Sequence, residues 1–374
     1  MKRMIYKQAV VLLLAAMFTL GGTISAIAWH DDGHTEQMHS DASQRGAPGK
    51  DAMGDTSVSI AGPTVAAFRE FTDVISVRID GHHLVLESDG LPNHQMMVGI
   101  RAWQQQVPLP QPFTGDNAWR LPLQPREAQE PISVLQEPIR GAIAIAVNGV
   151  PIFPALNNRG DDTYLAGELD HWGGHCGRGD DYHYHIAPTH LEEKVGRGNP
   201  IAFALDGFPI LGYLERDGSS PIGLDAFNGH NDDQGHYHYH ASRSFPYING
   251  GLRGVVEMNS DQIQQPRDSP IRPGQQPLRG ATITGFERNG DQFQLTYSVS
   301  GRDNRIQYQL MADESVQFSF VDASGSTSTA TYQRGRAPGR AGGGVGFMVL
   351  APIAFLFLLA IVAFLFRRKR PGLS

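Results

Sequence analysis

The sequence predicts a mainly β protein with a compact, duplicated central β domain of pseudo-twofold symmetry. A small antiparallel β unit and one C-terminal transmembrane helix are expected to follow it. Three observations predict this fold. Among 374 residues, glycine (43) and proline (24) are abundant while only 18% are charged, which favours turn-rich β structure. Short alternating polar and apolar runs recur along the chain. A histidine-rich motif occurs twice near its centre.

The composition excludes several classes of protein. Hydrophobic residues make up 40% of the chain, which is enough for a packed core and rules out wholesale disorder. The formal net charge of −7 argues against a nucleic-acid partner, because contacts with phosphate need a basic surface. The single cysteine excludes a disulfide scaffold and a thiolate-rich metal cluster.

Residues 1–28 predict a secretory signal peptide. Basic residues near the N-terminus precede an apolar run over 10–20, and Ala26-Ile27-Ala28 has the small residues of a cleavage site. The run is too short to span a bilayer, and an uncleaved anchor is the alternative. Residues 29–63 then predict a polar linker containing His34 and Met38. Such a His/Met tract either binds copper or is a solvated tail.

The C-terminus predicts a membrane anchor. Residues 347–366 carry no charge and are long enough to cross a bilayer as a helix. Residues 367–374 begin with Arg-Arg-Lys-Arg, and such a basic tail is expected to stay in the cytoplasm. The bulk of the chain is therefore expected to be exported, to the periplasm or the cell surface.

A glycine-rich linker over 335–346 precedes the predicted helix and contains Gly342-Gly343-Gly344. Glycines followed by an apolar helix and an arginine cluster resemble the GlyGly-CTERM sorting tails of Gram-negative bacteria. The resemblance implies cleavage by a sorting protease near Gly342-Gly343-Gly344 and transfer to the cell surface. A plain C-terminal anchor is the alternative.

Alternating runs predict strands on both sides of the histidine motifs. The runs at 74–79 and 83–87, with Asp80-Gly81 as a turn, open a central domain over 64–260. Residues 261–279 are rich in proline and glutamine and predict a linker. Residues 280–334 alternate again and predict a small antiparallel unit of four or five strands.

The centre of the chain is a duplication. Residues 169–185 and 224–240 both read L-D-x-x-x-G-H-x6-Y-H-Y-H, at an offset of 55. Upstream, residues 145–153 align with 203–211 at an offset of 58. The two repeats cover about 141–190 and 199–250. Because two copies are too few for a solenoid, they predict one compact domain in which the halves bury each other's apolar faces.

The duplicated motif predicts metal binding. In a strand, Tyr-His-Tyr-His places both histidines on one face and both tyrosines on the other. The Gly-His histidine, expected on a turn, adds a third imidazole, and its glycine allows the backbone to approach closely. Three imidazoles with an open position suit zinc, copper or iron, and copper or zinc is the expected ion. The predicted ligands are His175, His183 and His185 in the first copy and His230, His238 and His240 in the second.

The motif leaves two questions open. The spacing allows two separate metal sites or one shared dinuclear centre. It also allows a structural role, in which the histidines and tyrosines only hydrogen-bond within a glycine-rich core.

Other polar residues near the motifs have weaker claims. Asp170 and Asp225 recur before each Gly-His and either orient imidazoles or form turns. Cys176 follows His175, but the second copy has Asn231 at that position, so the thiol is not part of the repeated chemistry. The histidines without a counterpart in the other copy rank below the six: His94, His171, His190 and His236.

The twin Y-H-Y-H motifs, each after a Gly-His, resemble the YHYH domain family of exported proteins. The similarity extends over about residues 85–255 and includes Ser88-Asp89-Gly90-Leu91-Pro92-Asn93-His94 and Phe245-Pro246-Tyr247. Family members often carry cysteine before Gly-Gly-His, where this chain has Trp172. The resemblance implies the domain but brings no established activity with it.

Three functions follow as hypotheses. The first is an exported metal-binding protein for capture, sensing or sequestration. The second is a metalloenzyme, hydrolase or oxidoreductase, whose ion activates water or oxygen at an open position. The third is a surface structural or adhesion protein with a His/Tyr core. The sequence contains no nucleophile elbow, zincin helix or P-loop, which disfavours the familiar hydrolases and NTPases.

Overall fold

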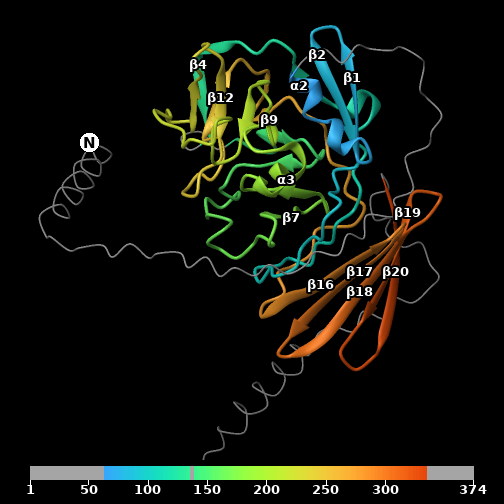
Figure 1. Cartoon of the computed structure of the whole chain (residues 1–374). Coiled ribbons are helices and arrows are strands. Elements are labelled where there is room, and N and C mark those ends of the chain that lie inside the picture. The colour runs from blue at the N-terminus through green and yellow to red at the C-terminus, as the bar shows by residue number, and fades with distance from the viewer. Residues whose placement is uncertain (1–62, 135–138, 335–374) are drawn as a thin grey trace, which may run out of the picture. The chain divides into compact units, whose positions relative to one another are not determined.

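The computed structural model describes residues 63–134 and 139–334 (Figure 1). The predicted signal peptide, the polar linker up to residue 62, the glycine-rich linker, the transmembrane helix and the basic tail all lie outside the described residues. In the described part of the chain, no helix is both long and apolar enough to cross a membrane.

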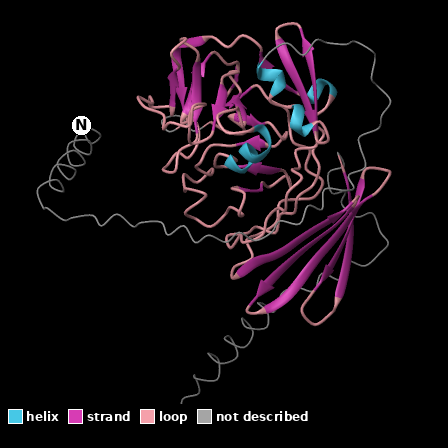
Figure 2. Ribbon diagram, in the orientation of Figure 1, coloured by secondary structure: helices cyan, strands magenta, loops and turns pink. Residues whose placement is uncertain are grey.

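Strands dominate the described residues, as predicted (Figure 2). The helical segments are all short: α2 (Pro63–Ala66), η1 (Arg69–Phe71), η2 (Gly115–Asn117), η3 (Thr189–Leu191) and α3 (Glu192–Val195). They carry none of the predicted ligands.

A three-stranded antiparallel sheet precedes the repeats. It consists of β1 (Ile75–Asp80), β2 (His83–Ser88) and β3 (Trp119–Pro122), in that order. β1 and β2 form the predicted hairpin, and Gly81 at its turn has a positive φ of 59°, a conformation that glycine adopts readily. Leu84, Val85 and Leu86 of β2 are fully buried, so this hairpin belongs to the core.

The two repeats form one eight-stranded sheet with mirrored strand order. The first contributes β5 (Ala144–Ala146), β6 (Pro151–Ile152), β7 (Gly174–Cys176) and β8 (Tyr182–Tyr184). The second contributes β9 (Ala202–Ala204), β10 (Pro209–Leu211), β11 (Gly229–Asn231) and β12 (Tyr237–His240). The order is β11-β12-β10-β9-β5-β6-β8-β7, so the halves join where β9 pairs with β5.

This order confirms the pseudo-twofold arrangement. β6 pairs parallel with β8, and β10 pairs parallel with β12 in the same way. The central strands are apolar and completely buried, with Ala144, Ile145 and Ala146 of β5 facing Ala202 and Phe203 of β9. The two Tyr-His-Tyr-His hairpins consequently lie at opposite edges of the sheet.

Two small ladders complete the central region. β4 (Glu127–Ser133) pairs with β13 (Gly251–Gly254), and β14 (Met258–Asn259) pairs with β15 (Gln262–Ile263). Residues 261–279, for which the composition predicts a linker, make specific contacts with the domain. Arg272 is buried and its guanidinium binds the carboxylate of Asp180 at 2.6 and 2.8 Å. Residues 261–279 therefore make tertiary contacts although they contain little regular secondary structure.

The predicted C-terminal β unit is a five-stranded antiparallel meander. Its strands follow sequence order and lie side by side in Figure 1. Phe293, Tyr308 and Phe318 from three successive strands stack with ring centroids 4.8 and 5.3 Å apart. The strands are β16 (Ala281–Asn289), β17 (Gln292–Val299), β18 (Arg302–Leu310), β19 (Ser315–Val321) and β20 (Thr327–Gln333).

Candidate metal centres

Each Gly-His and Tyr-His-Tyr-His pair forms one β-hairpin. In the first half, β7 pairs antiparallel with β8 and His175 lies directly opposite His183. In the second half, β11 pairs with β12 and His230 lies opposite His238. Directly opposed residues have Cβ atoms about 4.5–5.5 Å apart, which brings their side chains together. The Gly-His histidine therefore comes from a strand and not, as expected, from a turn.

Strand alternation supplies the third histidine of each set. His185 and His240 lie two residues after His183 and His238, so each pair points to the same side of its hairpin. The alternating tyrosines are buried on the other side, as the motif predicts.

The glycine before each strand histidine is required because a tyrosine ring packs on it. A Cβ atom at Gly174 would lie 2.5 Å from the hydroxyl oxygen of Tyr182. A Cβ atom at Gly229 would lie 2.1 Å from the hydroxyl oxygen of Tyr237. Both distances are too short for a side chain, so the predicted close approach is confirmed.

Asp170 and Asp225 hold the hairpins in place from the tyrosine side. Their Oδ2 atoms accept hydrogen bonds from the hydroxyls of Tyr182 and Tyr237, each at 2.8 Å. Each Oδ1 atom accepts hydrogen bonds from two backbone amides in the turn that leads from the aspartate into the strand. Of the two alternatives that the sequence left open, the structure shows the turn role, because both carboxylates accept from backbone amides and a tyrosine hydroxyl.

The first centre consists of His175, His183 and His185. Nε2 of His185 lies 3.0 Å from Nε2 of His175 and 3.2 Å from Nε2 of His183. The ring of Phe153 stacks on that of His183 with centroids 3.9 Å apart, which fixes the imidazole plane. Burial and the adjacent imidazoles hold the pKa of His175 well below its usual value, and lower that of His185 to about 3. These rings are therefore neutral at physiological pH, which is the form that binds metals.

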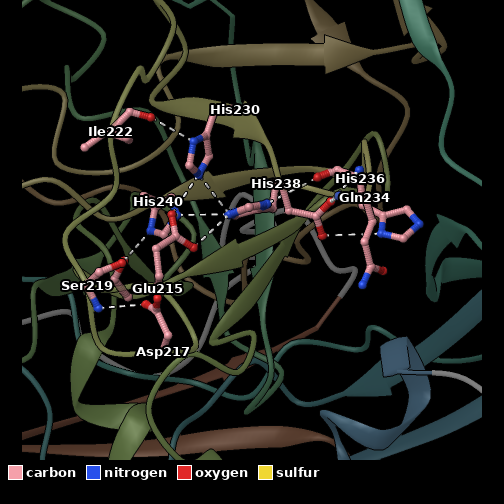
Figure 3. Close-up of polar contacts among 11 residues, drawn as sticks. Glu215, Asp217, Ser219, Ile222, His230, Gln234, His236, His238 and His240 are labelled. Carbon is pink, nitrogen blue, oxygen red and sulfur yellow. Dashed lines mark hydrogen bonds and ion pairs between the residues drawn. The ribbon is translucent and has the colours of Figure 1, made fainter.

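The second centre has a fourth member (Figure 3). Nε2 of His238 lies 3.1 Å from Nε2 of both His230 and His240. The carboxylate of Glu215 faces all three rings, with oxygen–nitrogen distances of 2.8 Å to His230, 3.4 Å to His238 and 3.2 Å to His240. Burial lowers the pKa of His240. The six histidines thus form two separate groups within the described residues, each able to hold an ion.

Backbone carbonyls select the tautomer of the rings. Nδ1 of His185 lies 2.5 Å from the Pro154 oxygen, and Nδ1 of His240 lies 3.0 Å from the Gly212 oxygen. Nδ1 of His183 lies 3.0 Å from the Asp181 oxygen, and Nδ1 of His230 lies 2.9 Å from the Ile222 oxygen. A carbonyl only accepts hydrogen bonds, so each Nδ1 carries a proton, and in the neutral ring Nε2 then presents a lone pair.

The three Nε2 atoms of each group converge on one point, and this arrangement fits a cation placed between them. Imidazole nitrogens bound tetrahedrally at 2.0–2.1 Å from zinc would be about 3.3 Å apart, close to the separations of 3.0–3.2 Å found here. Oε1 of Glu215 is buried and lies against Nε2 of His230 and Nε2 of His240, at 2.8 and 3.2 Å. A carboxylate that faces three imidazole nitrogens, with no polar donor from the described residues between them, has the surroundings expected of a metal ligand.

A comparison with known families matches the region that carries the first centre. The family model described as "YHYH protein" matches residues 118–222. The central region is a YHYH domain. The match covers the whole first repeat and the strands β9 and β10 of the second, in agreement with the resemblance seen in the sequence. No curated protein and no solved structure matches the chain.

Glu215 is a candidate ligand that the sequence alone did not indicate. It lies four residues after Leu211, and the offset of 58 that aligns the upstream strands pairs it with Asn157. The structure supports this pairing, since Asn157 and Glu215 begin equivalent turns: their amides bond to the oxygens of Asp161 and Ser219, both at 2.9 Å. Extending the alignment by four residues would have singled out this position.

The remaining candidates lie outside both centres. Cys176 is buried, and burial raises the pKa of its thiol well above the usual value, so it stays protonated and is a poor nucleophile. The rings of His94, His171 and His190 surround Trp172, with centroids 4.7, 5.4 and 4.8 Å from that of the indole. His236 is exposed beside Asp232.

Proposed function

We propose that this protein is an exported metal-binding protein whose YHYH domain holds one transition-metal ion in each half. The observation that carries the proposal is the convergence of three Nε2 lone pairs in both hairpins. A core of purely structural histidines would pair each ring nitrogen with a donor or acceptor of the opposite kind. Here the nitrogens face one another instead.

The ligand chemistry favours zinc or copper. Imidazole suits both ions, and neither centre includes a sulfur ligand among the described residues. Three imidazoles and one carboxylate complete a four-coordinate zinc site in the second half. The export signal and anchor predicted from the two ends of the chain would put both centres outside the cytoplasm, where capture or sequestration of metal is the simplest role.

Metal analysis of the purified chain tests this proposal. We expect about two equivalents of zinc or copper per chain in the wild type. The double variants His183→Ala/His185→Ala and His238→Ala/His240→Ala are each expected to retain one equivalent, and the two together none. His94→Ala/His171→Ala is the matched control and keeps both ions, because those histidines lie outside the centres.

The outcome also addresses the structural alternative. A folded wild-type chain that binds neither zinc nor copper on dialysis against micromolar metal would contradict the proposal and favour the His/Tyr core as a structural device.

A metalloenzyme is the second candidate function, and one observation favours it. The three imidazoles of the first centre line a cavity of about 340 Å³, and among the described residues no carboxylate occupies the position that Glu215 has in the second centre. Catalytic zinc sites have three protein ligands and one open position. We expect any turnover to be abolished by chelators and by the His183→Ala/His185→Ala variant.

A further inference from the structure

We infer that the two centres have different roles: the first binds a small anionic molecule at an open coordination position, whereas the second is closed by Glu215. This inference rests on the proposed function, because it requires an ion in the first centre. It assigns the ligand-binding role to one half of a duplicated domain.

First, the two halves have different residues at one equivalent position of their turns. At the offset of 58, Asn157 is equivalent to Glu215, and Pro154 is equivalent to Gly212. The backbone oxygen of Pro154 contacts Nδ1 of His185 in the first centre, and that of Gly212 contacts Nδ1 of His240 in the second. The Asn157 amide does not replace the carboxylate as a ligand. Its nitrogen donates to Glu168 Oε1 at 3.0 Å, and its oxygen accepts hydrogen bonds from two amides of its own turn. The fourth position of the first centre is therefore left to an external ligand.

The second argument is an unpaired donor in the wall of the same cavity. Trp119 is 2% exposed, and its indole Nε1 has no hydrogen-bond partner among the described residues. It lines the cavity together with the three imidazoles of the first centre. A buried N–H group without an acceptor costs free energy, so it points to a ligand with an oxygen or nitrogen atom that accepts this hydrogen bond.

The third argument is the charge beside the cavity. A larger hollow of about 700 Å³ shares Gln104, Arg159, Glu168 and Arg178 with it, so the two adjoin. Three arginines that line this hollow form no ion pair within the described residues: Arg101, Arg178 and Arg279. Unpaired guanidinium groups on a protein of net charge −7 mark a local site for anions, which they bind with paired hydrogen bonds.

Together these features define the ligand class. A small molecule with one donor atom on the open metal position and a carboxylate, phosphate or sulfonate group on the arginines fits them. Asp181 and Asp268 also line the cavity, with Asp181 3.2 Å from Nδ1 of His183, and add negative charge there. The anionic group is therefore expected on the arginine side, and a neutral or exchangeable donor on the metal side.

Cobalt(II) and azide provide a direct test on the full chain. Cobalt(II) takes the place of zinc and has a visible spectrum that changes when azide enters its coordination sphere. We expect two cobalt ions but one azide per chain. The His183→Ala/His185→Ala variant should lose azide binding, and His238→Ala/His240→Ala should keep it.

Exchange of the two turn residues sharpens the test. Glu215→Asn should create a second azide site while both centres still hold cobalt, and Asn157→Glu should remove the first. Arg178→Ala/Arg279→Ala should weaken azide about three- to tenfold at low salt and leave the binding of neutral imidazole unchanged, because only the anion interacts with these charges.

Different outcomes would overturn the proposed function and this inference. No cobalt in the first centre overturns the proposed function. Cobalt in both centres with azide bound to neither, to both, or only to the second overturns this inference alone, and the Glu215→Asn variant decides it even if Asn157→Glu does not fold.

Discussion

The tyrosines of each motif are as specific as the histidines, because each hydroxyl has a polar partner in the core. The Tyr239 hydroxyl donates to Asp206 Oδ2 at 2.6 Å and accepts from the backbone amide of Arg253 at 2.7 Å. At the equivalent place in the first half, the Tyr184 hydroxyl accepts from the side-chain amide of Asn148 at 3.0 Å. The repeat therefore has aspartate in one half and asparagine in the other at the same buried position.

This difference predicts a pH dependence of stability. Burial raises the pKa of Asp206 from 3.8 to about 6 in the folded protein. Between pH 4 and 6 the folded state therefore binds more protons than the unfolded state, and stability falls as pH rises through this window. Its contribution is on the order of 3 kcal/mol. Asp206→Asn should reduce the slope of the free energy of unfolding between pH 4 and 6, measured by urea denaturation with the same metal present in both proteins. Part of the slope should remain, because burial also raises the pKa of Asp170 to about 6.

The Asn148→Ala variant is the control for that slope, because it removes the equivalent side chain but no titrating group. A wild-type slope that survives undiminished in Asp206→Asn would show that Asp206 does not titrate in this window.

At the scale of elements, each candidate metal centre depends on a hairpin rather than on a loop. Cross-strand pairing aligns two histidines, and the carbonyls of Pro154 and Gly212 orient a third from a neighbouring turn. Ligands on strands are fixed by backbone hydrogen bonds, which keeps the imidazoles within a narrow range of geometry.

The glycines of these hairpins give a prediction at this scale. Gly174→Ala puts a Cβ atom 2.5 Å from the Tyr182 hydroxyl oxygen, which Asp170 holds in place, and Gly229→Ala makes the equivalent clash with Tyr237. We expect each variant to lose about 1–3 kcal/mol of stability, as in other overpacked cores. Each should also weaken metal binding in its own half only, as measured by thermal unfolding and metal titration.

Gly285 of β16 is the matched control. A Cβ atom there would lie 3.6 Å from Thr296, an ordinary contact, so Gly285→Ala should change stability little. Because replacing glycine by alanine lowers the entropy of the unfolded chain and so favours folding, equal losses at Gly285 and Gly174 would show that the tyrosine ring does not determine the effect.

At the scale of the molecule, buried ion pairing connects the segment after the repeats to the domain. The Arg272 and Asp180 side chains are each only 3% exposed, and Asp180 also accepts a hydrogen bond from the Val107 amide. Arg272→Met leaves the Asp180 carboxylate buried without its partner, which should cost about 3–5 kcal/mol. Chemical denaturation of the variant measures this loss.

An exposed ion pair is the control for that loss. Arg120 and Asp80 lie 2.9 Å apart with side chains 44% and 50% exposed. Arg120→Met should cost less than about 1 kcal/mol. A similar cost for both variants would show that burial of the Arg272 pair has no special weight.

Metal removal is expected to lower the melting temperature of the whole domain. Free metal at about 100 times the dissociation constant stabilises the folded state by about 2.7 kcal/mol per site. For a domain of this size, that corresponds to roughly 5–10 °C per site. Calorimetry with and without EDTA tests this, and the His238→Ala/His240→Ala variant should show about half the shift. An unchanged melting temperature would contradict metal binding to the native state.

The sequence alone determined the duplication, the β character and the six histidines, because a repeated pattern of residue types needs no knowledge of distant contacts. Strand alternation likewise separated the histidines of each motif from the tyrosines. Only the tertiary structure decided that the six form two centres, because this depends on β5 pairing with β9 and sending the hairpins to opposite edges. It also brought Glu215 to one centre and left Asn157 beside the other. A ligand from a separate turn shares no local pattern with the motif, and only chain folding brings the two together.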